Sequence, residues 1–187
     1  MKRHAAACRK TKTMFIHPNK QIRLRQYDYT QPGYYFVTIC TKNKTELFGT
    51  IEKCKMLLNE TGKIAERLWK QIPETCKVVS LDEFIVMPNH LHGIVVINPD
   101  RKGGTPRRAA TGLHALTPNS LPSIVNHYKG AVKKECNKNG FTDFLWQSRF
   151  YDHVIRKDES LDKIREYIRN NPLKWELDRN NPSSLYM

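Results

Sequence analysis

Apolar residues change their spacing several times along the chain, and each change predicts a different element. Residues 33–41, GYYFVTICT, are aromatic and β-branched and follow a Pro-Gly pair, which predicts a strand. The runs 76–88 and 90–98 predict an antiparallel hairpin, because Pro88 and Asn89 between them are typical turn residues. Two weaker patterns complete the set: a short hairpin in 47–59 and a strand at the end of 144–156.

Three segments place apolar residues at helical spacing instead. Residues 61–74 predict a helix that Pro73 closes. Residues 120–138 predict a helix with Ser120 or Ser123 as its N-cap. Residues 159–172 predict the last helix, whose apolar stripe consists of Leu161, Ile164 and Ile168.

The order strand, helix, strand, strand, helix, strand, helix predicts an α+β fold. It is the split βαβ pattern of a ferredoxin-like antiparallel sheet, with helices on one face and one additional C-terminal helix. We expect a basic, loosely ordered arm at 1–26, one domain at 27–177 and a short tail at 178–187. Within the domain, the Gly-, Pro- and Arg-rich residues 99–119 predict a mobile basic loop.

The charge narrows the class of partner. The chain has 32 Lys and Arg against 18 Asp and Glu, a net charge of +14, which favours a polyanion such as nucleic acid. No apolar run approaches the roughly 18 residues of a membrane span, and the N-terminus has no apolar signal core, so we expect a cytoplasmic protein. The five cysteines are scattered without a CxxC pair, which indicates free thiols.

Two histidines interrupt the apolar run FIVMPNHLHGIVVI at 84–97. On a strand His90 and His92 point to the same side, with Cα atoms about 7 Å apart, while Leu91 points into the core. We expect Ile94 and Val96 to share the buried face with Leu91. Two imidazoles that converge can bind a divalent metal, although two histidines at the start of a strand can also be satisfied by backbone or water. A catalytic metal site needs a further protein ligand.

Tyr167 and Asn171 lie four residues apart in EYIRNNP and therefore share a face of the last helix. Pro172 disfavours helical geometry at Asn171, so we expect Asn171 at a frayed helix end. Each residue by itself is also ordinary: a tyrosine on a helix flank, and an asparagine that ends a helix.

Three blocks in this order, MPNHLHG, WQSRFYDHVIR and EYIRNNPLKW, resemble the REP-associated tyrosine transposases. These belong to the single-tyrosine HUH endonucleases, named for their His-hydrophobic-His motif. The resemblance extends from about residue 27 to residue 177, with GYYFVTICT matching the first strand of the family. It implies that His90 and His92 bind the metal, that Asn171 is the third ligand, and that Tyr167 is the nucleophile.

The resemblance also implies an activity. The expected reaction is metal-dependent nicking and rejoining of single-stranded DNA at hairpin repeats, through a 5′-phosphotyrosine and with Mg²⁺ or Mn²⁺. We expect phosphate contacts from residues of the basic arm and loop, among them Arg23, Arg25, Arg101, Lys102, Arg107 and Arg108. This branch favours a monomer, whereas related insertion-sequence enzymes exchange the C-terminal helix within a homodimer.

Three alternatives stay open. Tyr151 shares a strand face with His153 and is a rival nucleophile, although it lacks an amide four residues later. A non-catalytic module that binds single-stranded DNA or RNA could have the same topology, and it would bind without metal. A metal-dependent hydrolase that uses a bound water would cleave without a covalent adduct.

Overall fold

The main sheet has four strands and is antiparallel throughout. The computed structural model describes residues 24, 27–99, 117–178 and 180–181. The strands lie in the order β4-β5-β1-β6, with the bounds β1 Gly33–Cys40, β4 Val79–Met87, β5 His90–Ile97 and β6 Tyr151–Ile155. The α+β class is thereby confirmed, and the succession β1, α1, β4, β5, α3, β6 follows the predicted split βαβ pattern.

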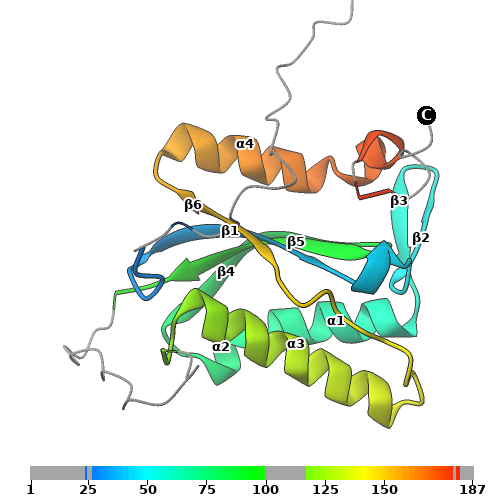
Figure 1. Ribbon diagram of the computed structural model, residues 1–187. Helices are drawn as coiled ribbons and strands as arrows, with labels where there is room; N and C mark the ends of the chain where they lie inside the picture. Colours follow the sequence, from blue (N-terminus) through cyan, green and yellow to red (C-terminus); the bar gives the residue numbers. More distant parts are fainter. Residues whose placement is uncertain (1–23, 25–26, 100–116, 179, 182–187) are drawn as a thin grey trace, which may run out of the picture.

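Helices cover both faces of this sheet (Figure 1). One face packs against α1 (Glu60–Lys70), α2 (Ile72–Thr75) and α3 (Leu121–Lys138), and the other against α4 (Asp158–Arg169). The expectation that Ile94 and Val96 share a face with Leu91 was wrong. Strand β5 is buried on both sides, and Ile94 and Val96 pack in the cluster under α4, on the same side as the histidines.

Gly93 allows the larger core to approach the centre of the sheet. A Cβ atom at Gly93 would lie 2.5 Å from the indole ring of Trp69, which is fully buried. A side chain there would displace the indole, so the glycine after the histidine pair is required by close packing rather than by backbone conformation.

Smaller elements refine the sequence predictions. The expected short hairpin is β2 (Gly49–Glu52) with β3 (Lys55–Leu58). Pro73 does not close α1, which already ends at Lys70, but lies in the first turn of α2, where proline needs no backbone donor. Ser120 caps α3 by accepting from the backbone N–H of Ser123.

The described part of the chain bears on the cysteines and on membrane spans. The cysteines in it, Cys40, Cys54, Cys76 and Cys136, form no disulfide with one another. No helix within the described ranges is long and apolar enough to cross a membrane. Most of the predicted arm and loop lie outside the described residues.

Two ion pairs hold α4 against the edge strand β4. Arg165 donates to both carboxylate oxygens of Asp82, at 2.9 and 2.6 Å, and Arg169 lies 3.7 Å from Glu83. The acidic pair lies where the pairing of β4 with β5 shifts register, so the irregularity presents it to the helix. The hydrogen bonds from Arg165 lower the pKa of Asp82 despite its partial burial.

The Asp82–Arg165 pair should therefore stabilise the packing of α4 against the sheet. We expect Asp82→Asn to lower the free energy of unfolding by about 1–2 kcal/mol at neutral pH, because a two-point charged contact is lost. The folded-state pKa of Asp82 is depressed, so the difference should shrink as the pH falls through that pKa.

Urea denaturation at neutral and acidic pH measures both effects. Glu60→Gln is the control, since the Glu60–Lys63 pair is exposed and should contribute little. Equal effects of the two substitutions at neutral pH would contradict the prediction.

Candidate active site

The two histidines meet on the face of the sheet that α4 covers. Strand pairing places His92 opposite Thr38 and His90 opposite Cys40. Both imidazoles are buried, with 0% of His90 and 2% of His92 exposed, and their Nε2 atoms lie 2.9 Å apart. The expected convergence of the pair is therefore present in the geometry.

The side chain of Asn89 determines which nitrogen of His90 carries a proton. Its Nδ2 donates to the carbonyl oxygens of Lys44 and Asn180, at 2.9 and 2.7 Å. Carbonyl oxygens only accept, so the oxygen of the Asn89 amide must face Nδ1 of His90, at 2.8 Å. Nδ1 of His90 is then the donor, and Nε2 keeps its lone pair for a metal.

Thr38 plays the corresponding part for His92, with its hydroxyl 2.8 Å from Nδ1. A hydroxyl can donate or accept. When Thr38 donates, Nε2 of His92 is protonated and can donate to His90. When Thr38 accepts, both Nε2 atoms present lone pairs to the same point, which is the arrangement that a cation needs.

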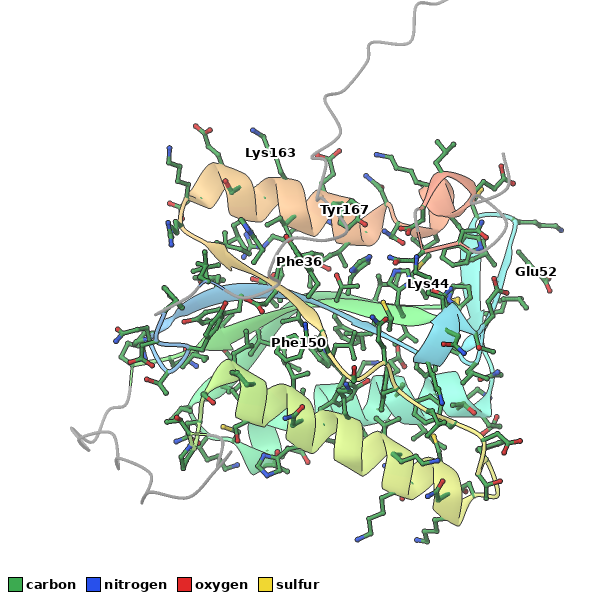
Figure 2. The ribbon with its side chains drawn as sticks, viewed as in Figure 1. Phe36, Lys44, Glu52, Phe150, Lys163 and Tyr167 are labelled. Carbon is green, nitrogen blue, oxygen red and sulfur yellow. The ribbon has the colours of Figure 1, made fainter. Side chains whose placement is uncertain are left out.

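Tyr167 brings its phenol to this pair from α4. Its Oη lies 3.3 Å from Nε2 of His92 in the same chain. Its ring contacts that of Phe36, with centroids 6.2 Å apart, in the space between α4 and the sheet (Figure 2). The side chain is 41% exposed, so the hydroxyl stands at the boundary between the buried imidazoles and solvent, where a substrate can reach it.

Asn171 lies close to this group of residues. The expectation that it lies at a frayed helix end was wrong. It is 1% exposed and has helical φ and ψ of −59° and −42°. Pro172 does not end the helical path, because it lies in the first turn of a 3₁₀ helix, η2 (Pro172–Leu177), that continues from α4. The Asn171 amide donates to Asp178 at 3.3 Å, while its buried oxygen has no hydrogen-bond partner among the described residues.

Two further residues of the site were not anticipated. Asp178 brings a carboxylate oxygen within 4.8 Å of ligand nitrogens of both histidines. Trp175 stacks on His90, with ring centroids 6.0 Å apart. The sequence could have indicated both residues, because positions 167, 171, 175 and 178 follow one another at helical spacing and so share a face if the helical path continues.

These donors fit a divalent cation. Two imidazoles and a carboxylate, with a buried amide oxygen nearby that has no hydrogen-bond partner within the described ranges, form a mixed nitrogen and oxygen set suited to first-row divalent metals. The buried side-chain oxygen of Asn171 is the strongest indication of a cation site. An unsatisfied buried acceptor costs free energy, and a bound cation would recover it.

The other candidates lie elsewhere. Tyr151 and His153 share the active-site face of β6, where Tyr151 contacts Phe36. Burial, and then the charge of Arg156, lowers the pKa of His153. His127 is exposed on α3. The predicted DNA-binding residues all lie outside the described residues: Arg23, Arg25, Arg101, Lys102, Arg107 and Arg108.

Comparisons with known proteins find relatives in sequence and in fold. No family model matches the chain. An uncharacterized protein of Haemophilus influenzae is 41% identical over 168 residues, which cover 88% of this chain and 93% of that protein. A second H. influenzae protein, provisionally named a REP-associated tyrosine transposase, is 26% identical over 79% of this chain and 74% of its own.

A solved structure shares the fold. It is described as a REP-associated tyrosine transposase bound to a REP hairpin, and it superposes with a TM-score of 0.57. The match covers 82% of this chain and 73% of the other at 19% sequence identity. At that identity the likeness concerns the fold.

The hydrogen bonds of Asn89 generate a prediction about metal binding. We expect Asn89→Ala to weaken Mn²⁺ binding about 10- to 100-fold, because His90 loses the acceptor that orients its ring. Asn89→Asp keeps an acceptor for His90 and should recover part of the affinity. Calorimetric titration with Mn²⁺ measures both variants.

The control is Asn139→Ala, at the exposed end of α3. Thermal denaturation without metal shows whether each variant folds. Folded Asn89→Ala protein with wild-type Mn²⁺ affinity would refute the prediction.

Proposed function

The chain belongs to the REP-associated tyrosine transposases, and on that premise we propose that it cuts and rejoins single-stranded DNA through a covalent bond to Tyr167. The observation that carries the proposal is the 3.3 Å distance between Oη of Tyr167 and Nε2 of His92 within one chain. A nucleophile next to a buried pair of metal-binding groups is the constellation that this chemistry requires.

The covalent step exchanges one phosphodiester for another. Oη of Tyr167 loses its proton and forms a bond to phosphorus, while the bond from phosphorus to the 3′ oxygen breaks and the departing 3′ oxygen takes up a proton. The products are a 5′-phosphotyrosine and a free 3′-OH strand, and attack by a 3′-OH on the phosphotyrosine reverses the exchange. The energy of the phosphodiester is kept in the phosphotyrosine bond, so rejoining needs no ATP.

We assign the cation site to His90, His92 and Asn171, with Asp178 as a further ligand. Mg²⁺ or Mn²⁺ bound there would polarise the scissile phosphate and stabilise the charge of the transition state. The chain itself supplies the orientation. Asn89 and Thr38 hold the imidazoles by hydrogen bonds, and Trp175 covers His90 from outside the sheet.

The proposed substrate is DNA with a hairpin and an unpaired flank. The structural neighbour is described as bound to a REP hairpin, and the net charge of +14 suits a polyphosphate. The six basic residues of the arm and loop named above remain our candidates for phosphate contacts, and they should act on affinity rather than on the chemical step.

Replacing Tyr167 by Phe tests the nucleophile. Incubation with a labelled hairpin oligonucleotide and Mn²⁺, followed by denaturing electrophoresis, should show a protein–DNA adduct for the wild type. Tyr167→Phe should abolish the adduct, because it lacks only the attacking oxygen.

Tyr151→Phe is the matched control and should keep the adduct, since Tyr151 belongs to β6. An adduct in Tyr167→Phe would refute the assignment of the nucleophile. Cleavage without any covalent product would favour the hydrolase, and metal-independent binding without cleavage the binding module.

A mixing experiment tests whether each site is built within one chain. Tyr167→Phe and His92→Ala should each be inactive. A mixture of them should also be inactive if α4 remains on the sheet of its own chain. The ion pair of Arg165 with Asp82 within one chain favours that arrangement. Adduct formation in the mixture would instead show that two chains exchange the helix.

A further inference from the structure

Phe36 connects the nucleophile to the histidine pair through its ring. The residue belongs to β1 and lies between the sheet and α4, with 7% of its surface exposed (Figure 2). Its ring stacks on that of His92, with centroids 5.3 Å apart and an angle of 27° between the planes, and it stands nearly perpendicular to the ring of Tyr167. We infer that Phe36 is the positioning residue for the Tyr167 phenol, an inference that rests on the proposed function.

Three aromatic rings contact one another at this point. The ring centroids of His92 and Tyr167 are 5.2 Å apart, those of Phe36 and Tyr167 are 6.2 Å apart, and the planes of the second pair meet at 79°. Edge-to-face contacts at such separations favour one relative orientation of the rings. The contact with His92 by itself would let the phenol pivot about its hydroxyl. The second contact, on Phe36, removes that freedom.

Burial does not fix the phenol, because much of the Tyr167 side chain is exposed. The hydroxyl oxygen is the side-chain atom farthest from the backbone of α4, so a small change in a side-chain torsion displaces it more than the other atoms. An attacking group misplaced by about 1 Å can lose a factor of about 100 in rate. The helix brings the phenol to the site, and contacts of the ring decide where its oxygen stands.

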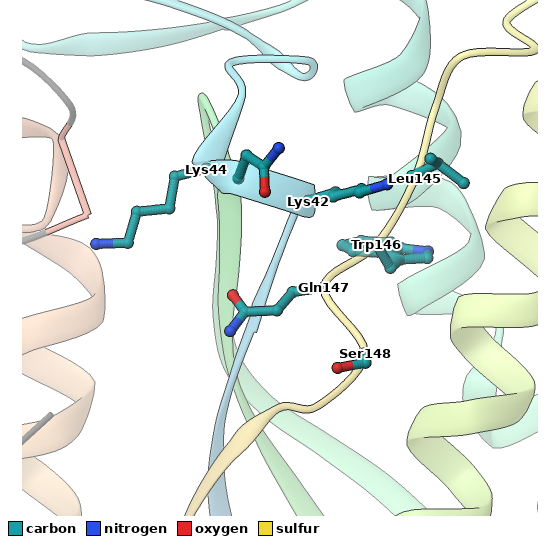
Figure 3. Close-up of a pocket in the computed structure, with 7 residues that line it drawn as sticks. Lys42, Lys44, Leu145, Trp146, Gln147 and Ser148 are labelled. Carbon is teal, nitrogen blue, oxygen red and sulfur yellow. The ribbon is translucent and has the colours of Figure 1, made fainter. Parts of the chain in front are cut away.

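Phe36 can serve as a fixed reference because β1 is hydrogen-bonded along both edges. The strand pairs with β5 on one side and with β6 on the other. The pairing continues beyond β1, where Thr41 forms a bridge with Trp146 beside the η1 turn, Lys42–Lys44 (Figure 3). The ring of Tyr151, on β6, also contacts Phe36, with centroids 6.4 Å apart. Phe36 is thus held by the sheet itself, and α4 packs onto it.

The contact leaves the nitrogens of the histidine pair available. Phe36 has no polar atom, and its ring covers a face of the His92 imidazole rather than the edge that carries Nε2. Thr38 holds the opposite nitrogen, Nδ1, at 2.8 Å. The phenol can therefore be oriented without competition for the lone pairs that a cation would use.

Replacing the ring by an aliphatic side chain tests the inference. We expect Phe36→Leu and Phe36→Met to slow single-turnover formation of the Tyr167 adduct about 10- to 100-fold at saturating hairpin DNA and Mn²⁺. The affinity for the hairpin, measured by fluorescence anisotropy in EDTA, and the affinity for Mn²⁺, measured by calorimetry, should not change. Methionine fills the space of the ring, and thermal denaturation shows whether each variant folds.

Nuclear magnetic resonance reports the position of the phenol without any reaction. The wild type should show nuclear Overhauser effects between ring protons of Tyr167 and His92, whose centroids are 5.2 Å apart. Both Phe36 substitutions should weaken these effects. Ile155→Val is the matched control, since Ile155 belongs to the same apolar cluster as Phe36, and it should keep the effects and the adduct rate of the wild type.

The outcomes separate this inference from the proposed function. An unchanged adduct rate or unchanged Overhauser effects in the folded Phe36 variants would overturn the inference. A parallel loss of Mn²⁺ affinity would overturn it as well, because Phe36 would then act through the metal ligand His92. A wild type that forms no adduct would refute the proposed chemistry, and the Overhauser effects would still decide whether Phe36 positions Tyr167.

Discussion

Burial of two imidazoles in the middle of a sheet is the constraint on which the site depends. A buried polar group must be hydrogen-bonded or bound to a charge, or it destabilises the fold. Here the outer nitrogens are satisfied by Asn89 and Thr38, which leaves the inner nitrogens facing each other 2.9 Å apart. A hydrogen bond between the two inner nitrogens or a shared cation would each satisfy both of them, so the arrangement around the pair is one that could hold a metal ion.

The position of Tyr167 depends on how one helix is held. α4 lies over the small apolar cluster on the active-site face and is fixed at the edge of the sheet by Arg165 and Asp82. The same segment continues through η2, so that Trp175 and Asp178 return to the histidines. One stretch of about a dozen residues, 167–178, therefore carries the phenol, the amide, the aromatic cover and the carboxylate of the site.

Asn89 links the reactive groups to the surface. Its amide joins the imidazole of His90 to the η1 turn (Lys42–Lys44) and to the backbone of Asn180.

The sequence by itself determined the class of fold, the face shared by His90 and His92, and the pairing of Tyr167 with Asn171. These follow from local periodicity, because a strand alternates every second residue and a helix repeats every 3.6. It did not determine that β5 is buried on both faces, or that Asn171 is enclosed rather than frayed. Both depend on where α4 and η2 pack.

Only the tertiary structure placed Thr38 opposite His92, turned the Asn89 amide toward His90 and brought Asp178 to the pair. These contacts join residues up to about ninety positions apart, as in the bond from Asn89 to Asn180. No local pattern encodes the register of two strands or the return of a tail to a sheet. Those are fixed when apolar surfaces pack and bring distant polar groups within hydrogen-bonding distance.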